Sequence, residues 1–200
     1  MCWNASVSLN TYIFGLFASL FSYYNKLTTF NDVIFYQSII IIQLIEYFIW
    51  SETFSNKLLS QIALLIILSQ PVFNILTIEK KPELIPYLLA AYLIFITVLY
   101  TLVIPLNTVS FSSVPSENGH LSWNWMNCNL FIVIIWYIFL ASRWVIDNMY
   151  LLLISITILL IITIVLFSDT NTWGSLWCWI CNITSLYFIM IIFYNNICQI

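Results

Sequence analysis

Long, uninterrupted apolar runs constrain this chain more than any other feature. A helix that crosses the hydrocarbon core of a bilayer needs about 20 apolar residues. Runs close to this length recur here, separated by charged residues, Pro, Asn or Ser. Because they lack the alternation of apolar and polar residues typical of barrel strands, we expect helices. The seven runs lie near residues 8–24, 33–50, 58–78, 85–104, 129–144, 149–167 and 173–197.

The composition supports the same class of protein. Hydrophobic residues make up 62% of the 200 residues and charged residues 6%, whereas a soluble domain has about 25% charged residues. We therefore predict an all-α protein, with a single transmembrane helical domain over residues 1–200 and an outer loop at 105–128. The lipid bilayer is the expected partner. With five Lys and Arg and a net charge of −3, the chain has no basic surface for nucleic acid.

The positive charges predict the orientation, because Lys and Arg in short loops stay on the cytoplasmic side. If all seven segments cross, Lys57 falls on one side and the other four cations on the opposite side. Those four are Lys26, Lys80, Lys81 and Arg143. The N-terminus is thus predicted outside and the C-terminus in the cytosol. If the fifth segment, near 129–144, is re-entrant, everything after Pro105 changes sides.

One acidic residue lies inside an apolar run, in the stretch QLIEYFIW. Gln43, Glu46 and Trp50 share a helix face, with Glu46 about one turn inside the outer end. An ionised carboxylate against lipid is costly, so this face is expected to point into the bundle. The alternative is an interfacial carboxylate that reaches water. Residues of similar depth on three other helices complete a predicted polar layer, namely Asn10, Ser60, Gln61 and Asn182.

A second polar group lies deeper in the third run, in the stretch LSQPVFN. Pro71 has no N–H to donate to the carbonyl group of Ile67, so we expect a kink with free backbone acceptors. Gln70 and Asn74 lie one turn apart beside it. Broken helices of this kind line substrate or ion paths in transporters, yet Pro and amides also serve packing in membrane helices. Packing is the favoured interpretation here.

Cys and Trp residues concentrate on the predicted outer side. Six Trp residues are interpreted as interfacial anchors, in preference to ligand-stacking groups. They are Trp3, Trp123, Trp125, Trp173, Trp177 and Trp179. Four Cys residues are candidates for disulfides or for small buried hydrophobes, namely Cys2, Cys128, Cys178 and Cys181. No metal site is expected, because one CxxC and a single imidazole, His120, provide too few ligands.

Three stretches, MCWNASVSL, QLIEYFIW and LSQPVFN, together resemble an uncharacterised family of small polytopic membrane proteins of large DNA viruses and of some algae and protists. The resemblance covers the first three predicted helices. It implies a seven-helix fold and, for a viral source, a host or virion membrane, and it brings no assigned activity. The positions that it marks for testing are Cys2, Trp3, Gln43, Glu46, Gln70, Pro71 and Asn74.

Two classes of function stay open. In a small transporter, channel or ligand receptor, Glu46 and the nearby amides would line an outward-facing cavity for a small ligand or ion. In a structural or interaction protein of a viral or organellar membrane, the same polar layer would hold the helices together without transport. An enzyme is disfavoured, because one His cannot build a multi-His zinc site and no second acid is evident near Glu46. No cofactor is expected.

Overall fold

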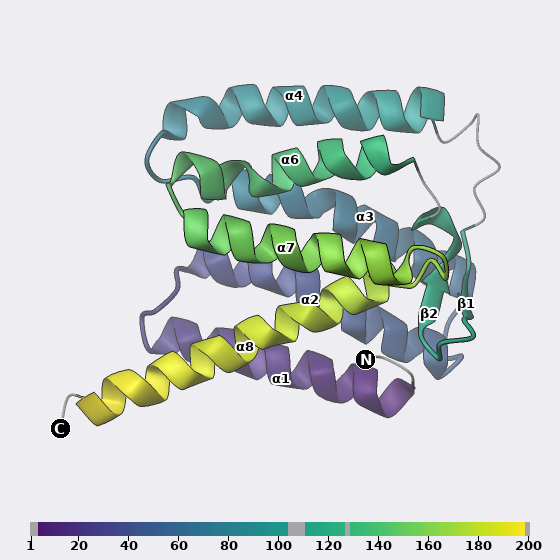
Figure 1. Ribbon diagram of the computed structural model, residues 1–200, viewed down its shortest axis with the longest axis horizontal. Coiled ribbons are helices and arrows are strands. Elements are labelled where there is room, and N and C mark those ends of the chain that lie inside the picture. Colours follow the sequence, from purple (N-terminus) through teal and green to yellow (C-terminus); the bar gives the residue numbers. More distant parts are fainter. Residues whose placement is uncertain (1–3, 104–110, 127–128, 199–200) are drawn as a thin grey trace.

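The computed structural model describes residues 4–103, 111–126 and 129–198, without the side chains at 102–103, 126, 177–181 and 195–198. Long helices pack into a bundle with a small sheet at one end (Figure 1). The helices are α1 (Ala5–Tyr24), α2 (Phe30–Trp50), α3 (Asn56–Ile75), α4 (Ile85–Val98), α6 (Leu130–Ile146), α7 (Tyr150–Phe167) and α8 (Trp173–Cys198). Shorter turns are η1 (Pro82–Leu84), η2 (Leu99–Val103) and η3 (Asn124–Met126).

The predicted helical class is confirmed. Within the described part of the chain, five helices are long and apolar enough to cross a membrane, judged by length and composition. They are α1, α2, α3, the segment Pro82–Thr101 around α4, and α7. The 17-residue α6 and the stretch Asn182–Tyr194 of α8 are shorter apolar helices. Each predicted run falls on one of the helices in Figure 1, while the number of crossings and the orientation stay predictions.

Side-chain caps and tight turns define the helix ends. The Asn4 side chain accepts a hydrogen bond from the Val7 N–H at the start of α1, and Thr29 with Asp32 forms a capping box at the start of α2. Just after the C-terminal ends of α1 and α2, Lys26 and Glu52 adopt the left-handed backbone conformation, with φ of 58° and 53°. Glycine usually occupies this position, and the chain has three Gly in all.

Small residues form the buried face of α1 and let α2 approach closely. That face consists of Ser8, Gly15, Ala18, Ser19 and Ser22. A Cβ atom at Gly15 would lie 2.8 Å from Cδ1 of Ile40 on α2. One turn further along, Nε2 of Gln37 donates a hydrogen bond to Oγ of Ser19 at 2.6 Å. Membrane helices commonly associate through small residues in this way, because there is no hydrophobic gain from pairing apolar faces in lipid.

The third helix, α3, packs against α2, α4 and α6, and its polar residues Ser60, Gln70 and Asn74 are buried. By contrast, the helices α4 and α7 expose most of their apolar surface: the best spanning window of each is 11% buried. Such a surface suits a lipid environment, in which apolar side chains need no protein cover. Some boundaries differ from the predicted runs: α1 and α2 begin three residues earlier, and α3 ends at Ile75, not near residue 78, because residues 76–77 form a turn.

A β-hairpin replaces part of the predicted outer loop at 105–128. Strand β1 (Ser113–Pro115) pairs antiparallel with β2 (Leu121–Trp123). The turn between them closes when the Ser116 N–H donates to the carbonyl oxygen of His120 at 2.8 Å. The hairpin lies at the end of the bundle where α2 ends and α3 and α8 begin (Figure 1). This is the end at which the buried acid of α2 is found.

Candidate functional site

Glu46 points into the bundle, as the cost of burying its charge in lipid predicts. Glu46 and Gln43 each have 0% exposure, and α2 packs against α1, α3 and α8. Both side chains have interaction partners. Full burial excludes the alternative that Glu46 is an interfacial carboxylate reaching water. The carboxyl group therefore belongs to the packed interior of the protein.

The rest of the predicted polar layer is only partly assembled. Ser60 is fully buried, and its hydroxyl lies 2.8 Å from Oγ of Ser113 in strand β1. Gln61 is half-buried, and Asn182 is half-buried with its Oδ1 atom 3.4 Å from Oγ of Ser185. Asn10 is exposed on α1, so its assignment to the layer is wrong. The depth of a residue in the membrane does not determine which way its side chain points around the helix axis.

A buried polar residue at this end of α1 is Ser8, not Asn10. Ser8 on α1 has 0% exposure. The contact of Gly15 with Ile40 fixes the register of α1 against α2. The two helices run antiparallel, so the positions two helical turns away from this contact, Ser8 on α1 and Tyr47 on α2, lie at the same level. Tyr47 is the residue after Glu46. The spacing of small residues along α1, such as Gly15 and Ser19, was the signal for this buried face.

The backbone acceptors near Pro71 are not free, contrary to the prediction. The carbonyl oxygen of Ile67, which Pro71 cannot serve, accepts a hydrogen bond from Nε1 of Trp136 on α6 at 3.1 Å. The next carbonyl oxygen, that of Leu68, accepts one from the hydroxyl of Tyr92 on α4 at 2.5 Å. The carbonyl group that Pro71 leaves without a helical donor is thus occupied by an aromatic donor of another helix, and Tyr92 adds a second contact one residue later.

The amides beside Pro71 bind neighbouring helices in the same way. Nε2 of Gln70 donates to the carbonyl oxygen of Ser38 on α2 at 3.1 Å, and Nδ2 of Asn74 donates to that of Leu140 on α6 at 2.5 Å. Gln70 is 1% exposed and Asn74 is fully buried. Around Pro71, α3 is therefore tied to α2, α4 and α6 through main-chain carbonyls, which supports the packing interpretation of this motif.

The hairpin is fixed to the bundle by similar contacts. The Asn56 side chain at the start of α3 pairs with the backbone of Ser113, donating to its carbonyl oxygen at 2.7 Å and accepting from its N–H at 2.9 Å. On the other strand, Nε1 of Trp123 donates to Oγ of Ser175 on α8 at 3.0 Å. Ser175 in turn donates to the carbonyl oxygen of Leu121 at 2.9 Å. The hairpin joins the starts of α3 and α8.

The interpretation of the Trp residues as interfacial anchors is wrong for three of them. Trp123, Trp125 and Trp173 are 1%, 9% and 9% exposed and belong to the main hydrophobic cluster of the bundle. The rings of Trp123, in strand β2, and Trp125 pack edge to face with centroids 5.5 Å apart. Trp3 and the side chains of Trp177 and Trp179 lie outside the described residues. The same holds for the four candidate disulfide cysteines, Cys2, Cys128, Cys178 and Cys181.

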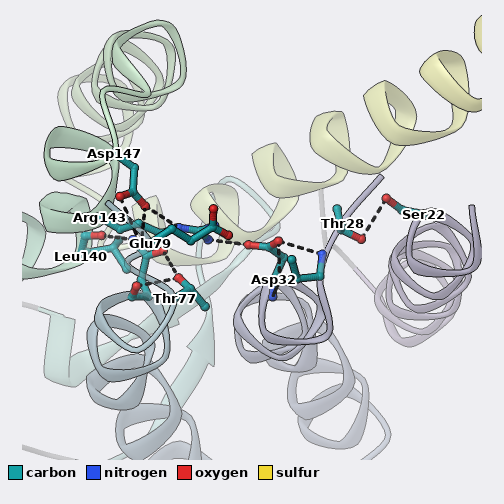
Figure 2. A network of polar contacts seen from close by, with 10 residues as sticks. Ser22, Thr28, Asp32, Thr77, Glu79, Leu140, Arg143 and Asp147 are labelled. Atoms are coloured by element: carbon teal, nitrogen blue, oxygen red, sulfur yellow. Dashed lines mark hydrogen bonds and ion pairs between the residues drawn. The ribbon is translucent and has the colours of Figure 1, made fainter. Parts of the chain in front are cut away.

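At the opposite end of the bundle, a network of charged residues connects neighbouring helices (Figure 2). The Arg143 guanidinium on α6 is 2.5 Å from Oδ1 of Asp32 on α2 and 3.5 Å from Oδ2 of Asp147. The Asp147 carboxylate also accepts from the N–H groups of Glu79, at 3.3 Å, and Lys80, at 2.9 Å. The arginine side chain is 9% exposed. One largely buried cation thus ties α2, α6 and the α3–α4 connection together.

An open pocket lies beside this network. It has a volume of about 560 Å³ and is formed by the α1–α2 turn, the start of α2 and Glu79. Its lining residues are Tyr23, Tyr24, Lys26, Leu27, Thr28, Thr29, Asp32 and Glu79. The pocket therefore lies at the end of the bundle away from the hairpin, whereas the predicted cavity was at the hairpin end, around Glu46.

Two groups of residues are thus candidates for a functional site: the buried acid of α2, and the charged end of the bundle with its pocket. Within the residues that the structure describes, no three His, Cys, Asp or Glu side chains are grouped as ligands for a metal ion. His120 is 6% exposed in the hairpin, where burial lowers its pKa below the ordinary 6.5. Comparison of the chain with protein-family models, curated proteins and solved structures gives no match.

Proposed function

We propose that this chain is a multi-pass integral membrane protein with a structural or interaction role, whose interior polar residues hold its helices together. The observation that carries the proposal is the set of contacts around Pro71. In a transport path, the carbonyl groups beside a proline stay open to ions or substrate. Here Trp136 and Tyr92 occupy the carbonyls of Ile67 and Leu68.

The burial of Glu46 supports the same proposal. An acid that exchanges ions or ligand with one side of a membrane needs a wet route to that side. Glu46 has 0% exposure, and the hairpin lies at the same end of the bundle. As a buried group among α1, α3 and α8, the carboxyl group would fix how α2 packs against its neighbours. A viral or organellar membrane is the proposed location, on the strength of the sequence resemblance alone.

The second candidate is a small transporter, channel or ligand receptor centred on Glu46. It is favoured by one observation: Glu46 and Gln43 lie fully buried on one face of α2, and an ionisable group inside a membrane helix indicates function by default. In this alternative the hairpin would cover the site in a closed state. Opening it would expose Glu46 to the outer side.

Two substitutions separate the candidates. Glu46→Gln keeps the shape and the hydrogen-bonding capacity but removes the charge, whereas Glu46→Leu removes both. The structural role predicts that Gln is tolerated and that Leu lowers the free energy of unfolding by about 1 to 3 kcal/mol, the usual cost of leaving buried polar groups without a partner. Glu83, which is exposed in η1, provides matched control substitutions to Gln and Leu.

Stability is to be measured by unfolding in detergent, and ion flux in proteoliposomes loaded with pH- and cation-sensitive dyes. The structural role predicts that the parent and both variants leak no more than empty vesicles. A parent that conducts protons or monovalent cations, together with a folded Glu46→Gln variant that does not, would establish the transport candidate instead. If both variants unfold like the parent, Glu46 does not hold the helices together and the proposal fails.

A further inference from the structure

The pocket at the charged end carries separated charges of opposite sign. Asp32 is neutralised by its ion pair with Arg143. Lys26 and Glu79 also line the pocket, and the ion pairs recorded among the described residues involve neither of them. An anion on Lys26 and a cation on Glu79 would therefore each meet an opposite charge. A ligand that carries both charges a few atoms apart suits this lining better than one with a single charge.

The position of the pocket points to the membrane surface. It opens at the turn between α1 and α2, two of the helices that are long and apolar enough to span. A turn between two spanning helices lies at the level of the lipid headgroups, where Tyr and Trp are enriched. Tyr23 and Tyr24 line the pocket and are 47% and 82% exposed. The ligand most abundant at this level is a phospholipid headgroup.

The pocket walls are held in place by polar contacts (Figure 2). The hydroxyl of Thr28 in the α1–α2 turn donates to Oγ of Ser22 at 3.1 Å. The backbone of Glu79 is held by the Asp147 carboxylate. These contacts hold Thr28 and the backbone of Glu79 in place before any ligand binds, which lowers the conformational entropy lost on binding.

We propose that this pocket binds the headgroup of a zwitterionic phospholipid, with the phosphate group beside Lys26 and the ammonium group beside Glu79 and the tyrosine rings. The volume of about 560 Å³ falls within the range of about 300 to 1,000 Å³ typical of small-molecule sites. Aromatic rings attract ammonium groups through their negative faces. An anionic headgroup lacks the cation for Glu79 and is repelled by it.

The test uses the full-length protein in detergent and short-chain lipids, with binding followed by native mass spectrometry. Dihexanoyl phosphatidylethanolamine and phosphatidylcholine are expected to bind about tenfold more tightly than dihexanoyl phosphatidylglycerol. The substitutions Lys26→Gln and Glu79→Gln are expected to weaken the zwitterionic lipids about threefold to tenfold each, because each removes one charge-assisted contact. Lys80→Gln and Glu83→Gln are the controls, since they remove the same charges at the same end outside the pocket.

Soluble sn-glycero-3-phosphoethanolamine, which carries the same phosphodiester and ammonium groups as the lipid, distinguishes two sources of the same chemistry. If it competes with the lipid at similar concentration, the headgroup alone is recognised; if the lipid binds and the soluble compound does not, the acyl chains contribute. Both results support the proposed pocket chemistry. Equal binding of zwitterionic and anionic lipids overturns it, and so does binding that is unchanged in Lys26→Gln and Glu79→Gln.

Discussion

Trp136 on α6 donates the hydrogen of its indole Nε1 to the carbonyl oxygen of Ile67 on α3, at 3.1 Å. This is the carbonyl that Pro71, four residues later in α3, leaves without its usual helical donor. The hydrogen bond thus makes the carbonyl group that Pro71 leaves open the point at which a second helix attaches.

The first prediction concerns the indole donor itself. Trp136→Phe keeps an aromatic ring but leaves the Ile67 carbonyl oxygen without a partner, so the free energy of unfolding should fall by about 1 to 3 kcal/mol. Trp125→Phe is the matched control: Trp125 is also buried in the main cluster, but its Nε1 has no hydrogen-bond partner among the described residues. Unfolding by SDS titration measures both, and an equal loss in the two variants would contradict the role of the hydrogen bond.

The second prediction uses Pro71 to test the same contact from the other side. Pro71→Ala restores an N–H group that competes for the carbonyl oxygen of Ile67. In the Pro71→Ala variant, Trp136→Phe should lower the free energy of unfolding by less than it does in the parent, with a coupling free energy of about 1 kcal/mol. The double-mutant cycle is measured by the same unfolding titration. Additive losses would show that Trp136 and the position of Pro71 act independently.

These contacts mark how far the sequence predicts the structure. The apolar runs predict the helices, because length and hydrophobicity alone decide what can span a bilayer. Pro71 also predicts an open carbonyl at Ile67. The donor for that carbonyl is not predictable, because Trp136 lies 69 residues away and only packing brings it there.

The hairpin and the Trp residues escaped prediction for a related reason. Each strand has three residues, too few to show an alternating pattern, and the hairpin is fixed by distant residues such as Asn56 and Ser175. Trp is common at membrane interfaces, yet Trp123 lies in strand β2, and its contact with Ser175 on α8 makes it a core residue. For Glu46 the sequence left two interpretations open, burial in the bundle, because a charge against lipid is costly, and an interfacial position that reaches water. The structure shows burial.

A third prediction concerns the close approach of α1 and α2. In Gly15→Leu the new side chain would collide with Ile40, since a Cβ atom alone would lie 2.8 Å from Cδ1. The expected loss of unfolding free energy is about 1 to 3 kcal/mol, as in other overpacked interiors. Ile40→Ala in the same chain should recover part of it by making room. The control is Phe17→Leu, because Phe17 lies on the same helix and is 57% exposed. A Gly15→Leu variant as stable as the control would contradict the packing.

The fourth prediction is a pH dependence that comes from His120. Burial lowers the pKa of this side chain from 6.5, so between its folded pKa and 6.5 the unfolded chain binds more protons than the folded one. Stability should therefore fall as the pH is lowered from about 7 to about 5. His120 is the single His of the chain, so His120→Asn should remove most of this slope. Thermal unfolding at several pH values checks it, and an unchanged slope in the variant would refute the assignment.

The most direct test of a packed, closed interior is the reactivity of Glu46 in the unmodified protein. A water-soluble carbodiimide with glycine ethyl ester modifies carboxyl groups that water reaches, and mass spectrometry then reads each position. In a lipid bilayer, the exposed Glu52 and Glu83 should react, while Glu46, with 0% exposure, should react only after unfolding in SDS. Modification of Glu46 in the folded protein at the rate of Glu52 would mean that water fills the bundle around it, which contradicts the structural role proposed here.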